Sequence, residues 1–201
     1  MKRLSIPIVV VFAIFFSGSS VQSQHKLESW YLYFGLGYAN PQYADEVEQV
    51  LDDIVDQPNV SHASIGLDLI GFYWPIGGKK TVIGGIINTF GDRYENDNVN
   101  ISFQLTGVTF AFSTMHYLTN EIGKGLFLRA DAGPARFTGD IEGGGISVTA
   151  STGWGFGALV GTGYSIPVSA GTRILLNANY AFRRVEGANI GAFAITVGGL
   201  F

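Results

Sequence analysis

The sequence predicts an all-β protein in which eight antiparallel strands, connected up and down, close into a transmembrane β-barrel. Three observations predict this fold class. Bulky apolar residues alternate with small or polar ones over eight segments, which is the period of a strand with two unlike faces. Short connections alternate with longer, more polar ones. The chain also ends on an aromatic residue in an apolar strand, which barrel closure would pair.

The first 23 residues predict a secretory signal peptide. Lys2 and Arg3 precede an apolar run over residues 6–16, and residues 17–23 are small or polar. The run is shorter than the roughly 20 apolar residues that a transmembrane helix needs. We expect cleavage after Ser23, which leaves residues 24–201 as one barrel domain. The chain has no cysteine, so neither a lipid-anchored cysteine nor a disulfide is expected.

The first four strands are expected over residues 30–39, 61–74, 81–91 and 99–112. In the first, every second residue from Trp30 to Tyr38 is large and apolar. The second turns Asp68 to its slim face, and the third is apolar on both faces. The fourth places Phe103 and Leu105 on its outer face and loses this phase beyond Gly107, which predicts a β-bulge there.

The other four strands are expected over residues 126–133, 153–164, 173–183 and 192–201. One face of the sixth is almost entirely glycine, so neighbouring side chains or water could occupy that side. Short connections follow strands two, four and six, at residues 75–80, 118–124 and 167–171. Longer ones on average follow strands one, three, five and seven, at residues 40–60, 92–98, 138–152 and 184–189. Bacterial transmembrane barrels have an even strand number, short periplasmic turns and longer outside loops.

The C-terminal strand carries its apolar side chains at Phe193, Ile195, Val197 and Phe201. This pattern resembles the closing strand of small bacterial outer-membrane β-barrels, and residues 29–201 resemble the OmpA-type and OmpX-type eight-stranded barrels. Gly199 departs from the aromatic residue often favoured two positions before the terminus. The resemblance implies a monomer in the outer membrane, with both termini in the periplasm. It also implies contact with lipid and lipopolysaccharide, and insertion by the barrel-assembly machinery, for which the last strand is the signal.

A soluble, ligand-carrying barrel of the lipocalin kind is the alternative fold, and it would turn its apolar faces inward. Here the charged residues share the slim faces, so those faces are expected to line the lumen. Aromatic residues near strand ends are expected to form the interfacial girdles of a membrane barrel. These are Trp30, Tyr73, Trp74, Tyr117, Trp154 and Tyr164.

Seven polar residues on the slim faces are expected to cross the lumen: Asp68, Arg129, Asp131, Arg173, Asn177, Asn179 and Arg183. Buried charges are costly unless they are paired and hydrogen-bonded. We therefore expect Asp68 and Asp131 to contact Arg129 and one of Arg173 or Arg183. Such a network would either plug the barrel or form a charged ring in a narrow pore.

The first long connection is expected to hold an amphipathic helix at about residues 42–56. Apolar residues recur there at helical spacing and six acidic residues occupy the remaining positions. The helix could act as a lid, an adhesive surface or a cation-binding patch, or it could simply pack on the rim. The acidic residues lack the spacing and central glycine of an EF-hand loop.

Catalytic and nucleic-acid functions have little support in the sequence. His62 and Ser64 share a strand face and weakly resemble the His-x-Ser pattern of lipid A deacylases, but Ile65 replaces the asparagine that follows. Three histidines and no cysteine predict neither a metal site nor a cofactor. The net charge of −4 becomes −6 when Lys2 and Arg3 are removed, which argues against nucleic acid. We expect a non-enzymatic structural or surface-interaction role. A narrow channel or conduit for hydrophobic solutes is the alternative, and lipid A modification comes third.

Overall fold

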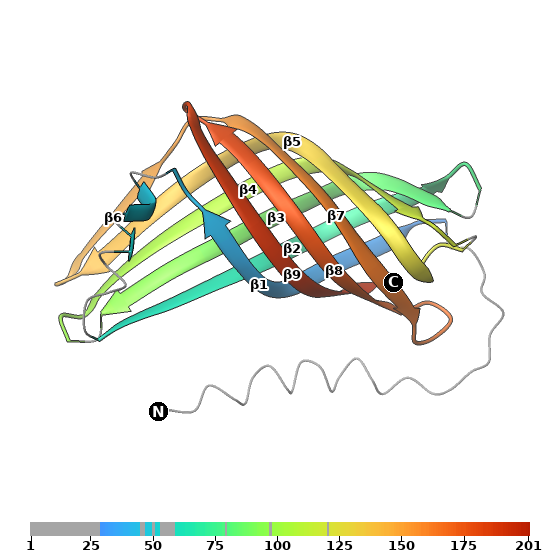
Figure 1. The fold of residues 1–201 in the computed structure, drawn as a ribbon, viewed down its shortest axis with the longest axis horizontal. Coiled ribbons are helices and arrows are strands. Elements are labelled where there is room, and N and C mark those ends of the chain that lie inside the picture. Colours follow the sequence, from blue (N-terminus) through green and yellow to red (C-terminus); the bar gives the residue numbers. More distant parts are fainter. Residues whose placement is uncertain are drawn as a thin grey trace.

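The computed structural model describes residues 29–44, 47–49, 51–52, 59–78, 80–96, 98–119 and 121–201. The predicted signal peptide lies outside these residues. The strands are β1 (Tyr31–Gln42), β2 (Val60–Ile76), β3 (Thr81–Asn96), β4 (Ile101–Tyr117), β5 (Gly125–Gly143), β6 (Ile146–Ser151), β7 (Gly155–Pro167), β8 (Arg173–Val185) and β9 (Ala188–Leu200). Figure 1 shows them tilted around a single barrel.

The predicted eight-stranded antiparallel barrel is confirmed. Each barrel strand pairs with its sequence neighbours, apart from the short β6, and β1 pairs with β9 to close the circle. The closure ends on two backbone hydrogen bonds between Leu32 and Phe201, each 2.9 Å long. β6 pairs only with β5 among the described residues, at the end of the barrel away from the C terminus (Figure 1). Of the helical segments among the described residues, none has the length and apolar character needed to cross a membrane.

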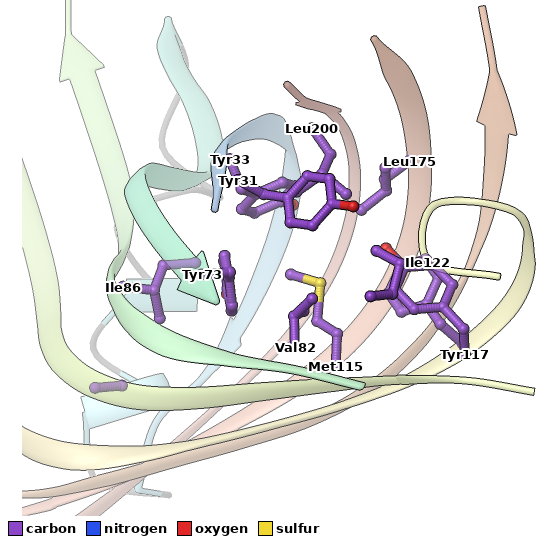
Figure 2. Close-up of a cluster of buried hydrophobic side chains, with 12 residues drawn as sticks. Tyr31, Tyr33, Tyr73, Val82, Ile86, Met115, Tyr117, Ile122, Leu175 and Leu200 are labelled. Carbon is purple, nitrogen blue, oxygen red and sulfur yellow. The ribbon is translucent and has the colours of Figure 1, made fainter. Parts of the chain in front are cut away.

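The two faces of the barrel wall have opposite chemistry, as the alternation predicts. Large apolar side chains such as Leu36, Leu128 and Val160 point outward and are 43%, 51% and 61% exposed. The inner face holds glycine, alanine, polar groups and a packed cluster of tyrosine and aliphatic side chains near the C-terminal end (Figure 2). An apolar exterior around a narrow, filled interior is the arrangement of a small transmembrane barrel.

A β-bulge in β2 overturns one prediction about the aromatic residues. The register between β2 and β3 shifts between Asp68 and Ile70, and the neighbouring residues Leu69 and Ile70 both point outward. The extra residue reverses the phase of the rest of the strand. Tyr73, expected at the membrane interface, is therefore buried inside the barrel, as Figure 2 shows.

β4 has no bulge at Gly107, contrary to the prediction. Its register with β3 runs without a shift from Ile101 to Tyr117. Gly107 faces inward, where an added Cβ would lie 2.7 Å from both Phe90 and Phe137. Phe103 shares this inner face and lies beside Tyr94, with ring centroids 6.2 Å apart. The same phase buries Tyr117, which is therefore not an interfacial residue either.

The connections opposite the short turns are tighter than the sequence suggests. Most of the segments expected as loops at residues 92–98 and 184–189 continue the strands. β8 and β9 join through Glu186 and Gly187, and β5 and β6 join through Gly144 and Gly145, all with positive φ as in two-residue hairpin turns. In the first connection, residues 47–49 and 51–52 are helical and Leu51 is buried. Of the helix expected at residues 42–56, Gln42 belongs to β1 and residues 43–44 are not helical. The remaining residues of that prediction lie outside the described part of the chain.

Candidate functional site

A buried ion-pair cluster crosses the middle of the lumen. Arg129 on β5 donates to Asp68 on β2 through Nη1 and Nη2, at 2.7 and 2.9 Å. Its Nη2 and Nε also donate to Asp131, two residues along β5, at 2.6 and 3.0 Å. All three side chains are at most 2% exposed. The guanidinium therefore holds two carboxylates at once, in the charge-assisted geometry that makes such bonds strong.

Neutral partners complete this cluster and extend it across the barrel. Asp68 accepts hydrogen bonds from Tyr33 Oη at 2.9 Å and from Asn88 Nδ2 at 2.8 Å. Ser113 donates to Asp131 and hydrogen-bonds Tyr73 Oη at 2.8 Å. Sequence reasoning missed these four partners. Asn88 lies in the strand whose sequence predicts two apolar faces, and the alternation in β2 predicts that Tyr73 faces outward. We call this group of seven residues the ionic belt.

The remaining lumen residues lie near the ionic belt but contact neither aspartate. Arg183 donates through Nε to Thr109 Oγ1 at 2.9 Å and through Nη2 to Asn88 Oδ1 at 2.6 Å. Arg173 lies further toward the C-terminal end, over the ring of Tyr31 at 5.2 Å. The predicted pairing of Arg173 or Arg183 with an aspartate is therefore wrong. Asn177, also buried, donates to Tyr33 Oη and to Thr196 Oγ1, both at 3.1 Å.

Side chains occupy the space beside the glycines of β7. A Cβ at Gly157 would lie 2.7 Å from Thr109, and one at Gly163 would lie 2.4 Å from Phe127. A Cβ at Gly161 would lie 2.0 Å from Asn179 Oδ1. The lumen also holds a cavity of about 20 Å³, lined by residues of β1, β2, β3, β7, β8 and β9. That volume accommodates about one water molecule.

A second polar cluster lies at the barrel mouth around the fully buried Asp92 of β3. Its Oδ2 accepts from Tyr43 and Tyr94, both at 2.9 Å, and its Oδ1 lies 2.6 Å from His62 Nε2. The imidazole of His62 also stacks on Tyr94, with ring centroids 4.5 Å apart. Burial and the Asp92 carboxylate raise the pKa of Tyr43 above its usual range. Sequence reasoning missed this mouth cluster because it placed Asp92 in a loop.

The mouth cluster lacks the contact between serine and histidine that a catalytic serine would need. Ser64 Oγ donates to the backbone oxygen of Gly91 at 3.4 Å. Among the described side chains, no hydrogen bond joins Ser64 to His62, and Asp92 already serves two tyrosines. A nucleophile needs its base within hydrogen-bond reach. His62 therefore acts in this structure as a partner of Asp92.

The outer aromatic residues occupy both ends of the apolar surface. Trp30, Trp74 and Tyr164 lie toward the C-terminal end and are 51–53% exposed, and Trp154 lies toward the other end at 60%. On the closing strand, Phe193, Ile195 and Val197 are 41–57% exposed. Phe201 stacks on Phe34 with centroids 5.5 Å apart. A Cβ at residue 199 would lie 2.5 Å from the Phe201 ring, which accounts for Gly199.

Comparisons with known proteins find likeness in structure alone. No family model matches the chain. No curated protein matches it either. Ail, the attachment invasion locus protein of Yersinia pestis, in complex with the heparin analogue sucrose octasulfate, superposes with a TM-score of 0.54 at 12% identity, covering 87% of this chain and 100% of that one. A second Ail structure gives 0.50 at 12% identity with the same coverage. This chain has the fold of a small outer-membrane β-barrel. Neisserial surface protein A gives 0.48 at 13% identity, covering 86% of this chain and 96% of that one.

Proposed function

We propose that this protein is a non-enzymatic, monomeric outer-membrane protein that acts by binding a partner at the cell surface. Its apolar exterior, bounded by Trp30, Trp74 and Tyr164 on one side and Trp154 on the other, would lie in the lipid and touch lipopolysaccharide. Both termini of the chain would then lie in the periplasm, and the β5–β6 hairpin would project outside. The closing strand β9 would serve as the signal for the barrel-assembly machinery.

The closed lumen is the observation that carries this proposal. The ionic belt spans the interior from β1 to β5, and every charge in it is paired. A solute path would have to break at least one buried ion pair. An eight-stranded barrel leaves room for little more than its own side chains. Transport through the centre is therefore disfavoured, and the chemistry available to partners lies on the projecting strands.

At the end of the barrel away from the C terminus, β2 to β6 continue as a sheet, which we call the projecting sheet, and β6 forms one of its edges. Within the described residues β6 pairs with β5 alone, so the backbone on its far side offers unpaired donors and acceptors. One cross-strand row on the inner face runs through Tyr94, Phe103, Ile141 and Val148. Ile141 and Val148 are 50% and 53% exposed. An extended peptide could add to this edge and continue the apolar row.

Single-channel recording tests the closed lumen. Protein refolded into a planar bilayer, with folding verified by a heat-dependent gel shift, should give no discrete conductance steps. Reproducible steps from folded protein would refute the proposal and support the channel alternative.

Two neighbouring substitutions test the surface role. Val148→Asp places a charge in the apolar row, whereas Ser147→Asp places the same charge on the opposite face of β6. Peptides selected from a random library on the refolded protein in nanodiscs should lose binding to Val148→Asp and keep binding to Ser147→Asp. Equal binding to both variants would contradict docking on the inner face.

A further inference from the structure

The cavity in the lumen is lined by an arginine with a free hydrogen-bond donor. Arg183 is 1% exposed and lines the cavity. Its Nε and Nη2 are hydrogen-bonded, but its Nη1 has no partner among the described residues. A buried N–H without an acceptor costs free energy, and it costs more when the group is charged. The cavity is therefore lined by a buried arginine that has one donor without an acceptor.

The surroundings of Arg183 hold little compensating negative charge. Among the described residues, no carboxylate lies within ion-pair distance of it. Its nearest link to one runs through Asn88, which accepts from Arg183 and donates to Asp68. Asp68 is already bound by both terminal nitrogens of Arg129. The guanidinium also lies over the ring of Phe90, 5.0 Å from its centroid, but no carboxylate contacts it directly and its link to Asp68 runs through an amide.

The other groups around the cavity suit a small negative guest. No carboxylate lines it, and part of its lining consists of the small residues Ala39, Gly66, Ala192 and Ala194. Asn179 also lines it, with its Oδ1 turned against Gly161, where a Cβ would lie 2.0 Å away. Because the amide is planar, its NH₂ group faces away from Gly161. Thr196 adds a hydroxyl to the same lining.

We propose that this cavity is a binding site for one monovalent inorganic anion of halide size, held by Arg183 with Asn179 and Thr196. The volume of about 20 Å³ admits a single guest of roughly the size of water and excludes larger oxyanions. An anion there neutralises the buried guanidinium directly and accepts a hydrogen bond from its unpaired Nη1. The inference goes beyond the surface role and is independent of it.

Unfolding of the refolded barrel in detergent, followed by the heat-dependent gel shift, tests the site. Sodium chloride, bromide and gluconate are compared at equal ionic strength. Chloride and bromide at tenfold above their Kd should raise Tm by about 3–6 °C over gluconate. Arg183→Met should abolish the difference. Arg184→Met, which removes the adjacent exposed arginine, should keep it.

A second variant and a direct measurement guard against misfolding of Arg183→Met. Ala194→Ile fills the cavity from β9 while leaving Arg183 in place, and it should also abolish the halide effect. Crystals grown with bromide should show an anomalous peak beside Arg183. Equal Tm in halide and gluconate, as a water-filled cavity would give, overturns the proposal. So does a halide effect that survives Arg183→Met, or a bromide crystal without the peak.

Discussion

Replacing Arg129 by methionine should be among the most damaging single substitutions in the barrel. The change keeps an unbranched side chain but removes every charge-assisted hydrogen bond from Arg129 to Asp68 and Asp131. Two carboxylates then remain buried with only Tyr33, Asn88 and Ser113 as donors. Removing one partner of a buried ion pair costs about 3–5 kcal/mol, because the other charge stays uncompensated.

Urea unfolding of the refolded protein, followed by tryptophan fluorescence and the gel shift, measures this cost. With a slope of about 2 kcal/mol per molar urea, a loss of about 4 kcal/mol lowers the midpoint by about 2 M. Arg93→Met is the matched control, since Arg93 is 48% exposed and lies 3.5 Å from Glu95. Exposed pairs contribute about 0–1 kcal/mol, so its midpoint should barely move.

A triple variant isolates the charge effect from packing. Asp68→Asn and Asp131→Asn combined with Arg129→Met remove all three charges while keeping similar volumes. If uncompensated charge is the cause, the triple variant should be more stable than Arg129→Met alone. A loss below about 1 kcal/mol for Arg129→Met, or no recovery in the triple variant, would refute the role assigned to the ionic belt.

Two further predictions concern strand packing and the mouth. Gly84→Ala would place a Cβ 1.7 Å from the backbone oxygen of Phe72. It should lower the free energy of unfolding in urea by about 1–3 kcal/mol. Gly171→Ala is the control and should have no effect, because the space around Gly171 is open. The pKa of Tyr43 is raised beside Asp92, so its neutral phenol stabilises the mouth cluster fully below the ordinary tyrosine pKa of about 10. This stability is lost as the pH rises through the higher pKa of the folded state. In an ultraviolet titration of tyrosinate, Tyr43→Phe should therefore remove a component that titrates above a pH of about 10, and loss of a component at or below that pH would contradict the contact.

The sequence predicts the barrel well because alternation, turn length and strand closure are local or periodic signals. Arg129 and Asp131 are two residues apart on a slim face, so their shared direction follows from strand geometry. Their meeting with Asp68 follows from the narrow lumen and the cost of unpaired charge. The central ion pairs can thus be predicted from the sequence.

One group of errors comes from the phase of a strand after an irregularity. One extra residue at Leu69 exchanges the two faces of β2, and no single residue type announces it. Tyr73 then moves from the exterior to the interior. The mouth cluster has a different cause, because the polar residues Asp92 and Tyr94 suggest a loop, whereas β3 continues to Asn96.

The unequal lengths of the strands place the unpaired backbone of β6 on one side of the mouth. β8 and β9 turn at Glu186 and Gly187, opposite the start of β7, whereas β5 continues eight residues beyond Ala135 to Gly143. A strand that continues past its neighbour must leave an edge unpaired, and β6 covers β5 only by exposing an edge of its own. The residues on β6 are uncharged and carry no proline, so the usual protections of an edge are missing there. A barrel that is closed at its centre by paired charges and leaves the edge of β6 unpaired at its rim has the features that the proposed surface role requires.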